Sequence, residues 1–254
     1  MTTSLQNKKI LITREQKQAS AFAEKIVQYG GDPVEVPLLE IICKDRPEDR
    51  SVFQSLAAFQ WVFFTSANGV DCFFQLLHKH HIQPAILKSI KIAVVGHKTE
   101  NALKEHGISA DFIPTVYDAE HMVREFLTHF TVEGSFLLVR GNRSRTVLPE
   151  KFSQIGVDFS AIEVYETGFN YKMAGRLNEV LKEKWYDFIT FTSPSTVDAF
   201  TEMAVTDYEK KCVCIGTTTE ARAREHGFTM ILTPEEFTID GMLTSMCNHL
   251  AMKG

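Results

Sequence analysis

The sequence predicts an α/β protein made of two similar parallel-sheet domains, each with three layers. Two observations support this prediction. Short apolar runs alternate with helical patterns, and the two halves of the chain contain similar runs and motifs in the same order. Strands that alternate with helices form parallel sheets with helices on both faces. The 254 residues, 44% of them hydrophobic, suffice for one large core or two ordinary ones.

The expected strands are six apolar runs. In the first half they lie at 10–13 (ILIT), 61–66 (WVFFTS) and 92–96 (IAVVG), and in the second half at 136–140 (FLLVR), 188–193 (FITFTS) and 212–216 (CVCIG). The helical patterns between them end in glycine, for example at 19–30 and 99–107, and glycine is common just past a helix C-terminus. Pro194 suits the first turn of a helix, so Ser193 before it is the expected N-cap.

Three blocks of the chain repeat in the same order. Residues 8–41 match 134–167 and pair Arg14 with Arg140; 63–70 (FFTSANGV) match 190–197 (TFTSPSTV); and 92–114 match 213–234, including a shared Glu-His-Gly. Similar strand–helix units share hydrophobicity, but that likeness does not predict three collinear blocks. We therefore expect an internal duplication of a unit of roughly 125 residues.

The matched turns predict anion-binding edges. In open parallel sheets, ligands bind outside the carboxyl ends of the strands, where helix N-termini present free N–H groups. Four matched residues occupy such turns: Ser66, Ser193, Gly96 and Gly216. Arg14 and Arg140 follow equivalent strands and are candidate ligand contacts. Helix capping and structural salt bridges remain alternative roles for the hydroxyl groups and the arginines.

Composition and motifs exclude several function classes. The net charge of −5 gives no basic field for nucleic acid, and no apolar run reaches the roughly 18 residues that span a membrane. Neither GxGxxG, GxxxxGK[ST] nor GxSxG occurs, which argues against nucleotide cofactors and a serine nucleophile. HKHH at 78–81 has no ligand partner at metal-site spacing, so we interpret it as a solvated helix end.

The five cysteines, at 43, 72, 212, 214 and 247, contain no CxxC and suggest neither a disulfide framework nor a zinc site. They favour buried thiols in a reducing cytosol. Cys212 and Cys214 are expected on one face of a strand. No export signal is evident, and we expect a cytoplasmic protein.

Tyr165 breaks the symmetry of the repeat. Its counterpart in the first copy is Leu39, so Tyr165 adds a proton donor to one copy only. A buried structural tyrosine is the alternative.

Together these blocks resemble the uroporphyrinogen-III synthase family over nearly the whole chain. The resemblance rests on LITR, PLLEI, FTSANGV, VVGHKT, VRG, EVYET, DFITFTSPSTV, IGTTT and a late GM, in this order. It implies a discontinuous domain of 1–37 plus 169–254, a second domain of 42–164, two strand-like linkers at 38–41 and 165–168, and a cleft between the domains. It also suggests a monomer.

The resemblance further implies the activity. Family members convert hydroxymethylbilane, a linear tetrapyrrole with eight carboxylates, into uroporphyrinogen III for haem, sirohaem and cobalamin synthesis, without metal or cofactor. Water is lost, and ring D is inverted through a spiro intermediate. Tyr165 matches the proposed catalytic tyrosine, and further cleft positions are Ser66, Thr99, Ser195, Thr218 and Thr219. The resemblance implies no nucleic-acid or membrane partner and leaves open a transient hand-over to neighbouring pathway enzymes.

One departure from the family pattern concerns charge. Glu100 and Glu220 stand where relatives commonly have alanine, and they must point away from a carboxylate ligand. Two other functions are weighed against the synthase. One is a noncatalytic cytosolic two-lobed module that binds or senses a polyanion. The other is a sugar-phosphate isomerase, which would lack an obvious catalytic carboxylate or histidine.

Overall fold

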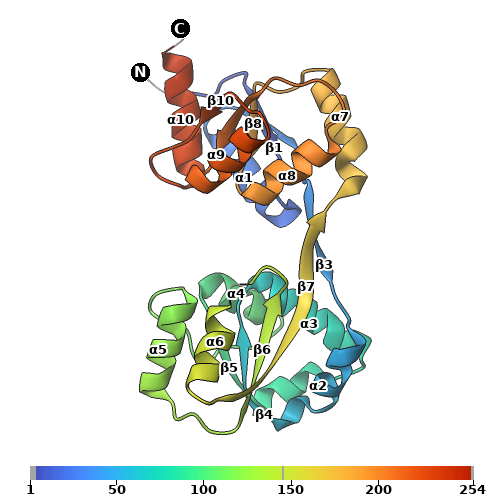
Figure 1. Ribbon diagram of the computed structural model, residues 1–254, viewed down its shortest axis with the longest axis vertical. Coiled ribbons are helices and arrows are strands. Elements are labelled where there is room, and N and C mark those ends of the chain that lie inside the picture. The colour runs from blue at the N-terminus through green and yellow to red at the C-terminus, as the bar shows by residue number, and fades with distance from the viewer. Residues whose placement is uncertain (1–3, 145, 253–254) are drawn as a thin grey trace. The chain divides into compact units, whose positions relative to one another are not determined.

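The computed structural model describes residues 4–144 and 146–252. These residues form two compact units: unit 1 contains the described residues up to Glu40 and from Gly168 onward, and unit 2 is Ile41–Thr167. The chain therefore passes between the units twice, once inside each of the two segments expected to be linkers. In both units a sheet lies between helices (Figure 1).

Unit 1 is built on a parallel sheet. Its strands are β1 (Lys9–Ile12), β2 (Asp32–Glu35), β8 (Phe188–Phe191), β9 (Lys211–Cys214) and β10 (Met230–Leu232), in the order β10-β9-β8-β1-β2. Its helices are α1 (Gln16–Gln28), α7 (Ala174–Lys182), α8 (Pro194–Met203), α9 (Thr217–Glu225) and α10 (Ile239–Ala251), with a short 3₁₀ helix at Tyr171–Met173.

Unit 2 has the second sheet. Its strands are β3 (Leu39–Cys43), β4 (Phe59–Phe64), β5 (Lys91–Val94), β6 (Ser135–Gly141) and β7 (Asp158–Phe169), in the order β3-β7-β6-β4-β5. Its helices are α2 (Arg50–Gln54), α3 (Ala67–Lys79), α4 (His97–Glu105), α5 (Ala119–His129) and α6 (Val147–Gln154), with 3₁₀ helices at Pro47–Asp49, Leu56–Ala58 and Pro84–Ser89.

The two sheets share one strand order, as a duplication requires. The repeat pairs β1 with β6, β2 with β7, β8 with β4 and β9 with β5, and the order β9-β8-β1-β2 then matches β5-β4-β6-β7. Unit 2 also has a residue at the position that corresponds to β10. Phe112 makes an isolated parallel bridge to Ala93 in β5. Each sheet therefore combines strands from both copies of the repeat.

Strands β3 and β7 carry the chain from one unit to the other. Lys44 N–H donates to Val164 O at 2.7 Å, and Asn170 N–H donates to Leu38 O at 2.8 Å. Residue numbers therefore rise from 38 to 44 on one strand while those of the partners fall from 170 to 164 on the other, so β3 is antiparallel to β7. It is the exception in otherwise parallel sheets.

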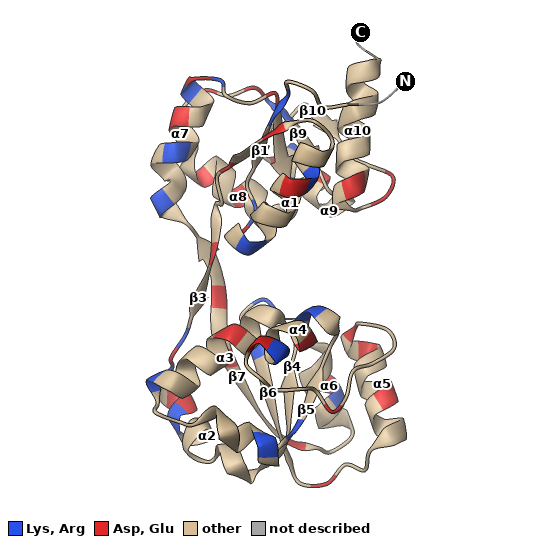
Figure 2. Cartoon of the chain, turned by 180° about the vertical axis from the view of Figure 1, so that it is seen from behind, with Lys and Arg blue, Asp and Glu red and all other residues tan. Residues whose placement is uncertain are grey.

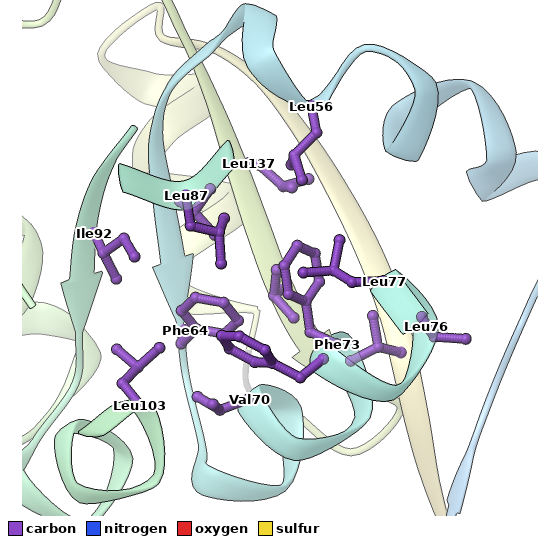
Figure 3. Packing of buried hydrophobic residues seen from close by; sticks show 14 of the residues in the cluster. Leu56, Phe64, Val70, Phe73, Leu76, Leu77, Leu87, Ile92, Leu103 and Leu137 are labelled. Carbon is purple, nitrogen blue, oxygen red and sulfur yellow. The ribbon is translucent and has the colours of Figure 1, made fainter. Parts of the chain in front are cut away.

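Apolar cores lie on both faces of each sheet, which confirms the three-layer prediction. In unit 2, α2, α3 and α4 cover one face, where Phe64, Phe73 and Leu137 pack together (Figure 3), and α5 and α6 cover the other. In unit 1, α7, α8 and α9 cover one face, and α1 and α10 cover the other.

The matched His-Gly motifs have a structural explanation. Gly107 and Gly227 follow α4 and α9 with φ of 73° and 83°, the left-handed conformation that glycine adopts freely at a helix C-terminus. The histidines before them contact matched aspartates: His106 faces Asp71 at 3.7 Å in unit 2, and His226 faces Asp198 at 3.1 Å in unit 1. These repeats therefore tie neighbouring helices together.

The cysteine prediction is half wrong. Cys43 at the end of β3 and Cys72 in α3 form a disulfide, whereas the sequence led us to expect free thiols. Their sequence separation of 29 gives no sign that the two segments meet. Cys212 and Cys214 are free and buried on one face of β9, as expected, with their sulfurs 3.7 Å apart. Their mutual hydrogen bond and burial raise the pKa of Cys212, so its thiol stays protonated.

Candidate active site

Tyr165 lies beside the N-terminus of α3 in unit 2. Its hydroxyl is 3.0 Å from Oγ of Ser66, the residue that caps this helix by accepting the N–H of Gly69 at 3.0 Å. The tyrosine is half-buried and packs against the core beneath α3. A phenol is thus held where a helix presents its N–H groups and partial positive charge.

A β-bulge turns Tyr165 toward that helix. Along β6 and β7, Arg140 pairs with Glu163 but the next residue, Gly141, pairs with Tyr165, so Val164 is the extra residue. With strict alternation Tyr165 would point away from the face that buries Val164. After the bulge it packs on that same face. The bulge therefore sets the direction of the phenol.

Four matched turns place helix N-termini at the carboxyl ends of the strands. Ser66 and Ser193 cap α3 and α8, and Ser193 forms a capping box with Thr196. Gly96 and Gly216 are the N-caps of α4 and α9, with no side chain to satisfy the helix N–H groups. Free amides at these ends are suited to anions.

The matched arginines lie at the same edges. Arg14 follows β1, and Arg140 is the second-last residue of β6. Nε of each arginine is buried without a hydrogen-bond partner. The guanidinium of Arg14 donates to Gln18, and that of Arg140 donates to Ser144 O at 2.8 Å. Burial lowers the pKa of Arg14, with Glu15 opposing that effect.

The predicted threonines divide into two groups. Thr99 and Thr219 are only 5% and 1% exposed, so their hydroxyls lie inside the fold, while Thr218 is exposed at the start of α9. Ser195 is half-buried in the first turn of α8. Of these three threonines, only Thr218 is exposed to solvent.

The two unexpected glutamates are engaged by cations of their own helices. Glu100 pairs with Lys104 at 2.7 Å and His97 at 3.1 Å, and Glu220 pairs with Arg224 at 2.7 Å. The hydrogen bond from Lys104, and then that from His97, lowers the pKa of Glu100. Their charges are thus partly compensated within the helix.

Two aromatic residues at these edges were not predicted from the sequence. A Cβ added to Gly96 would lie 3.0 Å from the ring of Tyr117, and one added to Gly216 would lie 3.1 Å from the ring of Phe237. Both residues are more than half exposed, at 55% and 56%. They are separated by 120 residues, the offset of the repeat in this region, which is the signal that could have found them.

The charge distribution leaves anion binding to individual groups. Lys and Arg are interspersed with Asp and Glu on both units in the view of Figure 2, which agrees with the net charge of −5. In the described parts of the chain, no three His, Cys, Asp or Glu side chains are grouped to hold a metal ion. His80 of the HKHH run is less solvated than predicted, because it stacks on Phe53 and pairs with Asp45.

Comparison with known proteins adds a family assignment. A family model described as uroporphyrinogen-III synthase HemD matches residues 20–244. The uroporphyrinogen-III synthase of Chlorobaculum parvum is 32% identical over 238 residues, covering 91% of this chain and 94% of that protein. The porphyrin biosynthesis protein HemD of Ruminiclostridium josui is 27% identical over 243 residues. This chain spans about half of that relative's length, 48%.

Solved structures support the same fold. Uroporphyrinogen-III synthetase from Helicobacter pylori aligns with a TM-score of 0.60 at 19% identity, over 97% of this chain and 99% of that one. A mutant uroporphyrinogen III synthase from Thermus thermophilus aligns with a TM-score of 0.56 at 18% identity, over 96% and 99%. With the family model covering most of its length, the chain belongs to the uroporphyrinogen-III synthase family.

Proposed function

We propose that this chain cyclises hydroxymethylbilane to uroporphyrinogen III, with loss of water and inversion of ring D through a spiro intermediate. Membership of the family supports the reaction. The observation that carries the assignment of roles is the phenol of Tyr165, held 3.0 Å from Ser66 at the N-terminus of α3. It is a proton donor among groups that suit anions.

The substrate's carboxylates find matching donors at the carboxyl ends of the strands. We assign them to the helix N-termini that begin after Ser66, Gly96, Ser193 and Gly216, supported by the hydroxyls of Ser195 and Thr218. Arg14 and Arg140 each have a buried Nε–H without a partner, and a guanidinium suits a carboxylate through paired hydrogen bonds. Tyr117 and Phe237 offer exposed faces for pyrrole rings.

Tyr165 acts at the first chemical step. Its O–H bond breaks as the proton passes to the departing hydroxyl, the carbon–oxygen bond breaks, and the pyrrole nitrogen's electron pair forms the azafulvene. The substituted carbon of ring D attacks to give the spiro intermediate, which fragments and recloses. The proton lost when the last ring regains aromaticity restores the phenol, so the net change is loss of one water.

Selectivity follows from orientation. The substrate is reactive enough to close without the enzyme, giving the uninverted isomer I. A bound geometry that presents ring D's substituted carbon to the azafulvene can contribute as much as ~7–11 kcal/mol.

One assay tests the reaction against the noncatalytic alternative. Freshly prepared hydroxymethylbilane is supplied, the products are oxidised to porphyrins, and isomers III and I are quantified. A catalyst gives an excess of isomer III, whereas a module that only binds polyanions leaves isomer I forming at the spontaneous rate. That second outcome would reject the proposed function.

A cytoplasmic location is also proposed. No helix among residues 4–144 and 146–252 is long and apolar enough to cross a membrane. The bond between Cys43 and Cys72 argues against this location, because disulfides rarely persist in the cytosol. Its redox state in cells therefore tests the proposed location. Alkylation of these thiols in intact cells would show whether the pair is reduced there.

A further inference from the structure

Gly141 lies directly under the ring of Tyr165. The two residues are partners on β6 and β7, and a Cβ added to Gly141 would lie 2.6 and 2.7 Å from Cε2 and Cε1 of the tyrosine, and closer still to Cζ. Carbon atoms do not approach so closely without displacement. The φ of Gly141 is not in the left-handed region, so the backbone itself would accept alanine. The glycine is required by the ring, not by a turn.

The backbone around the ring is also fixed. Asn142 N–H donates to Tyr165 O at 3.0 Å, and Gly141 N–H donates to Ser144 Oγ at 3.0 Å. With the main chain held on one side and Ser66 hydrogen-bonded to the hydroxyl on the other, the phenol has one well-defined place.

The repeat shows that the glycine and the tyrosine depart from symmetry together. In the first copy, Gly141 corresponds to Glu15 and Tyr165 to Leu39, whereas Ser66 keeps a serine counterpart in Ser193. Only the copy that has the phenol also has the glycine that makes room for it.

We propose that Gly141 and Ser66 are positioning residues for Tyr165, and that together they hold its phenol in the orientation that protonates the leaving hydroxyl. This inference rests on the proposed role of Tyr165. Gly141 seats the ring. Ser66 accepts the N–H of Gly69 with one lone pair and donates its own O–H to the tyrosine oxygen as that oxygen gains negative charge.

The first test is Gly141→Ala, with Gly175→Ala as the matched control. Gly175 lies in α7 with open space around its Cβ position, so alanine is accepted there. We expect Gly141→Ala to lower kcat for isomer III roughly 10²-fold with little change in KM, because a small misplacement of a catalytic group has effects of that size. The control should keep the native rate.

A double-mutant cycle asks whether Gly141 acts through Tyr165. In the Tyr165→Phe background, Gly141→Ala should lower kcat by less than about 2-fold further, because the phenol is already absent. A second cycle needs no activity. Gly141→Ala should lower the thermal midpoint by roughly 2–10 °C in the native chain and leave it unchanged in a Tyr165→Ala background, where the clash is gone.

The Ser66 series separates capping from proton donation. Ser66→Thr keeps both the cap and the hydroxyl and should keep kcat within about 3-fold. Ser66→Asp keeps a strong cap but has no proton to donate at neutral pH, and Ser66→Ala loses both. We expect both of these to lower kcat roughly 10²-fold, while the Asp variant retains the native thermal midpoint.

Three results would overturn the positioning role. They are a native rate for Gly141→Ala, an equal effect of Gly141→Ala with and without the phenol, and Ser66 variants that raise only KM. If Tyr165→Phe is itself fully active, the positioning role also fails, because no proton donor needs positioning. Isomer III made by the native chain would still stand as the reaction, which keeps the two conclusions distinguishable.

Discussion

At the scale of single residues, the phenol oxygen of Tyr165 can be removed while the ring stays in place. Tyr165→Phe loses one hydrogen bond with Ser66, which costs about 1 kcal/mol of unfolding free energy. We expect kcat for isomer III to fall roughly 10²–10⁴-fold, the usual contribution of a general acid. Tyr171→Phe, at a residue 59% exposed, is the control. An unchanged rate would leave Tyr165 a structural residue.

Substitution of Arg14 or Arg140 is expected to weaken substrate binding. Replacing either by glutamine removes a charged donor, and a charge-assisted hydrogen bond contributes about 1.5–3 kcal/mol. KM should therefore rise roughly tenfold or more, with little change in kcat. Arg176→Gln in α7 is the control, because Arg176 is paired with Glu179 at 2.7 Å on an exposed surface. Lost stability with a native KM would instead indicate a structural role.

At the scale of elements, Asp45 joins the segment after β3 to the end of α3. Lys79 contacts it at 2.7 Å and His80 at 2.9 Å. The hydrogen bond from Lys79, and then that from His80, lowers the pKa of Asp45, while burial opposes them. A carboxylate with a depressed pKa stabilises the fold above its unfolded pKa of about 4, and that contribution disappears as the pH falls through its folded pKa.

Asp45→Asn should therefore lower the thermal midpoint near pH 6 and have a smaller effect near pH 2. The size is at most about 1 kcal/mol, or roughly 2–4 °C, because the ion pairs are partly exposed. Asp207→Asn, at an exposed position, controls for the loss of one charge. An effect of equal size at both pH values would show that packing, and not charge, is responsible.

The disulfide ties the same two elements. Bridging Cys43 to Cys72, 29 residues apart, restricts the unfolded chain by about 3–4 kcal/mol in the chain-entropy model. A reducing agent should therefore lower the urea midpoint of the oxidised chain, and it should not change that of Cys43→Ser/Cys72→Ser. Five reactive thiols in the unreduced, denatured protein would contradict the bond.

The Asp45 ion pairs and the disulfide illustrate which features of the elements can be predicted from the sequence and which cannot. Six strands, the glycine helix ends and the N-cap Ser193 follow local rules and were predicted, whereas the short strands β2 and β10 were not. The Cys43–Cys72 bond and the contact of Ser66 with Tyr165 join segments far apart in the chain. Such contacts depend on strand order and on a β-bulge, which local patterns do not encode. The bulge in β7 is the clearest case, because strict alternation predicts the opposite direction for Tyr165.

At the scale of the whole molecule, the repeat and the folding units do not coincide. The repeat divides the chain into consecutive halves, but each sheet takes strands from both. The repeat alone suggests one domain in each half of the chain. The discontinuous domain was expected only because of the family resemblance. Unit 2 is contiguous in sequence, and both of its cores use only residues within it. Unit 1 needs two segments, because β1 lies between β8 and β2.

This difference predicts how fragments behave. Residues 41–167 should fold alone and unfold in one cooperative urea transition, because a unit with its own core is a folding domain. Residues 168–254 should not fold alone, since they lack β1 and the core residues Leu5, Ile10 and Phe22, but they should gain helical circular dichroism when a peptide of residues 1–40 is added. The same mixture with residues 41–80 is the control. A cooperative transition for 168–254 alone would show that β1 is dispensable, and a disordered 41–167 would show that unit 2 depends on unit 1.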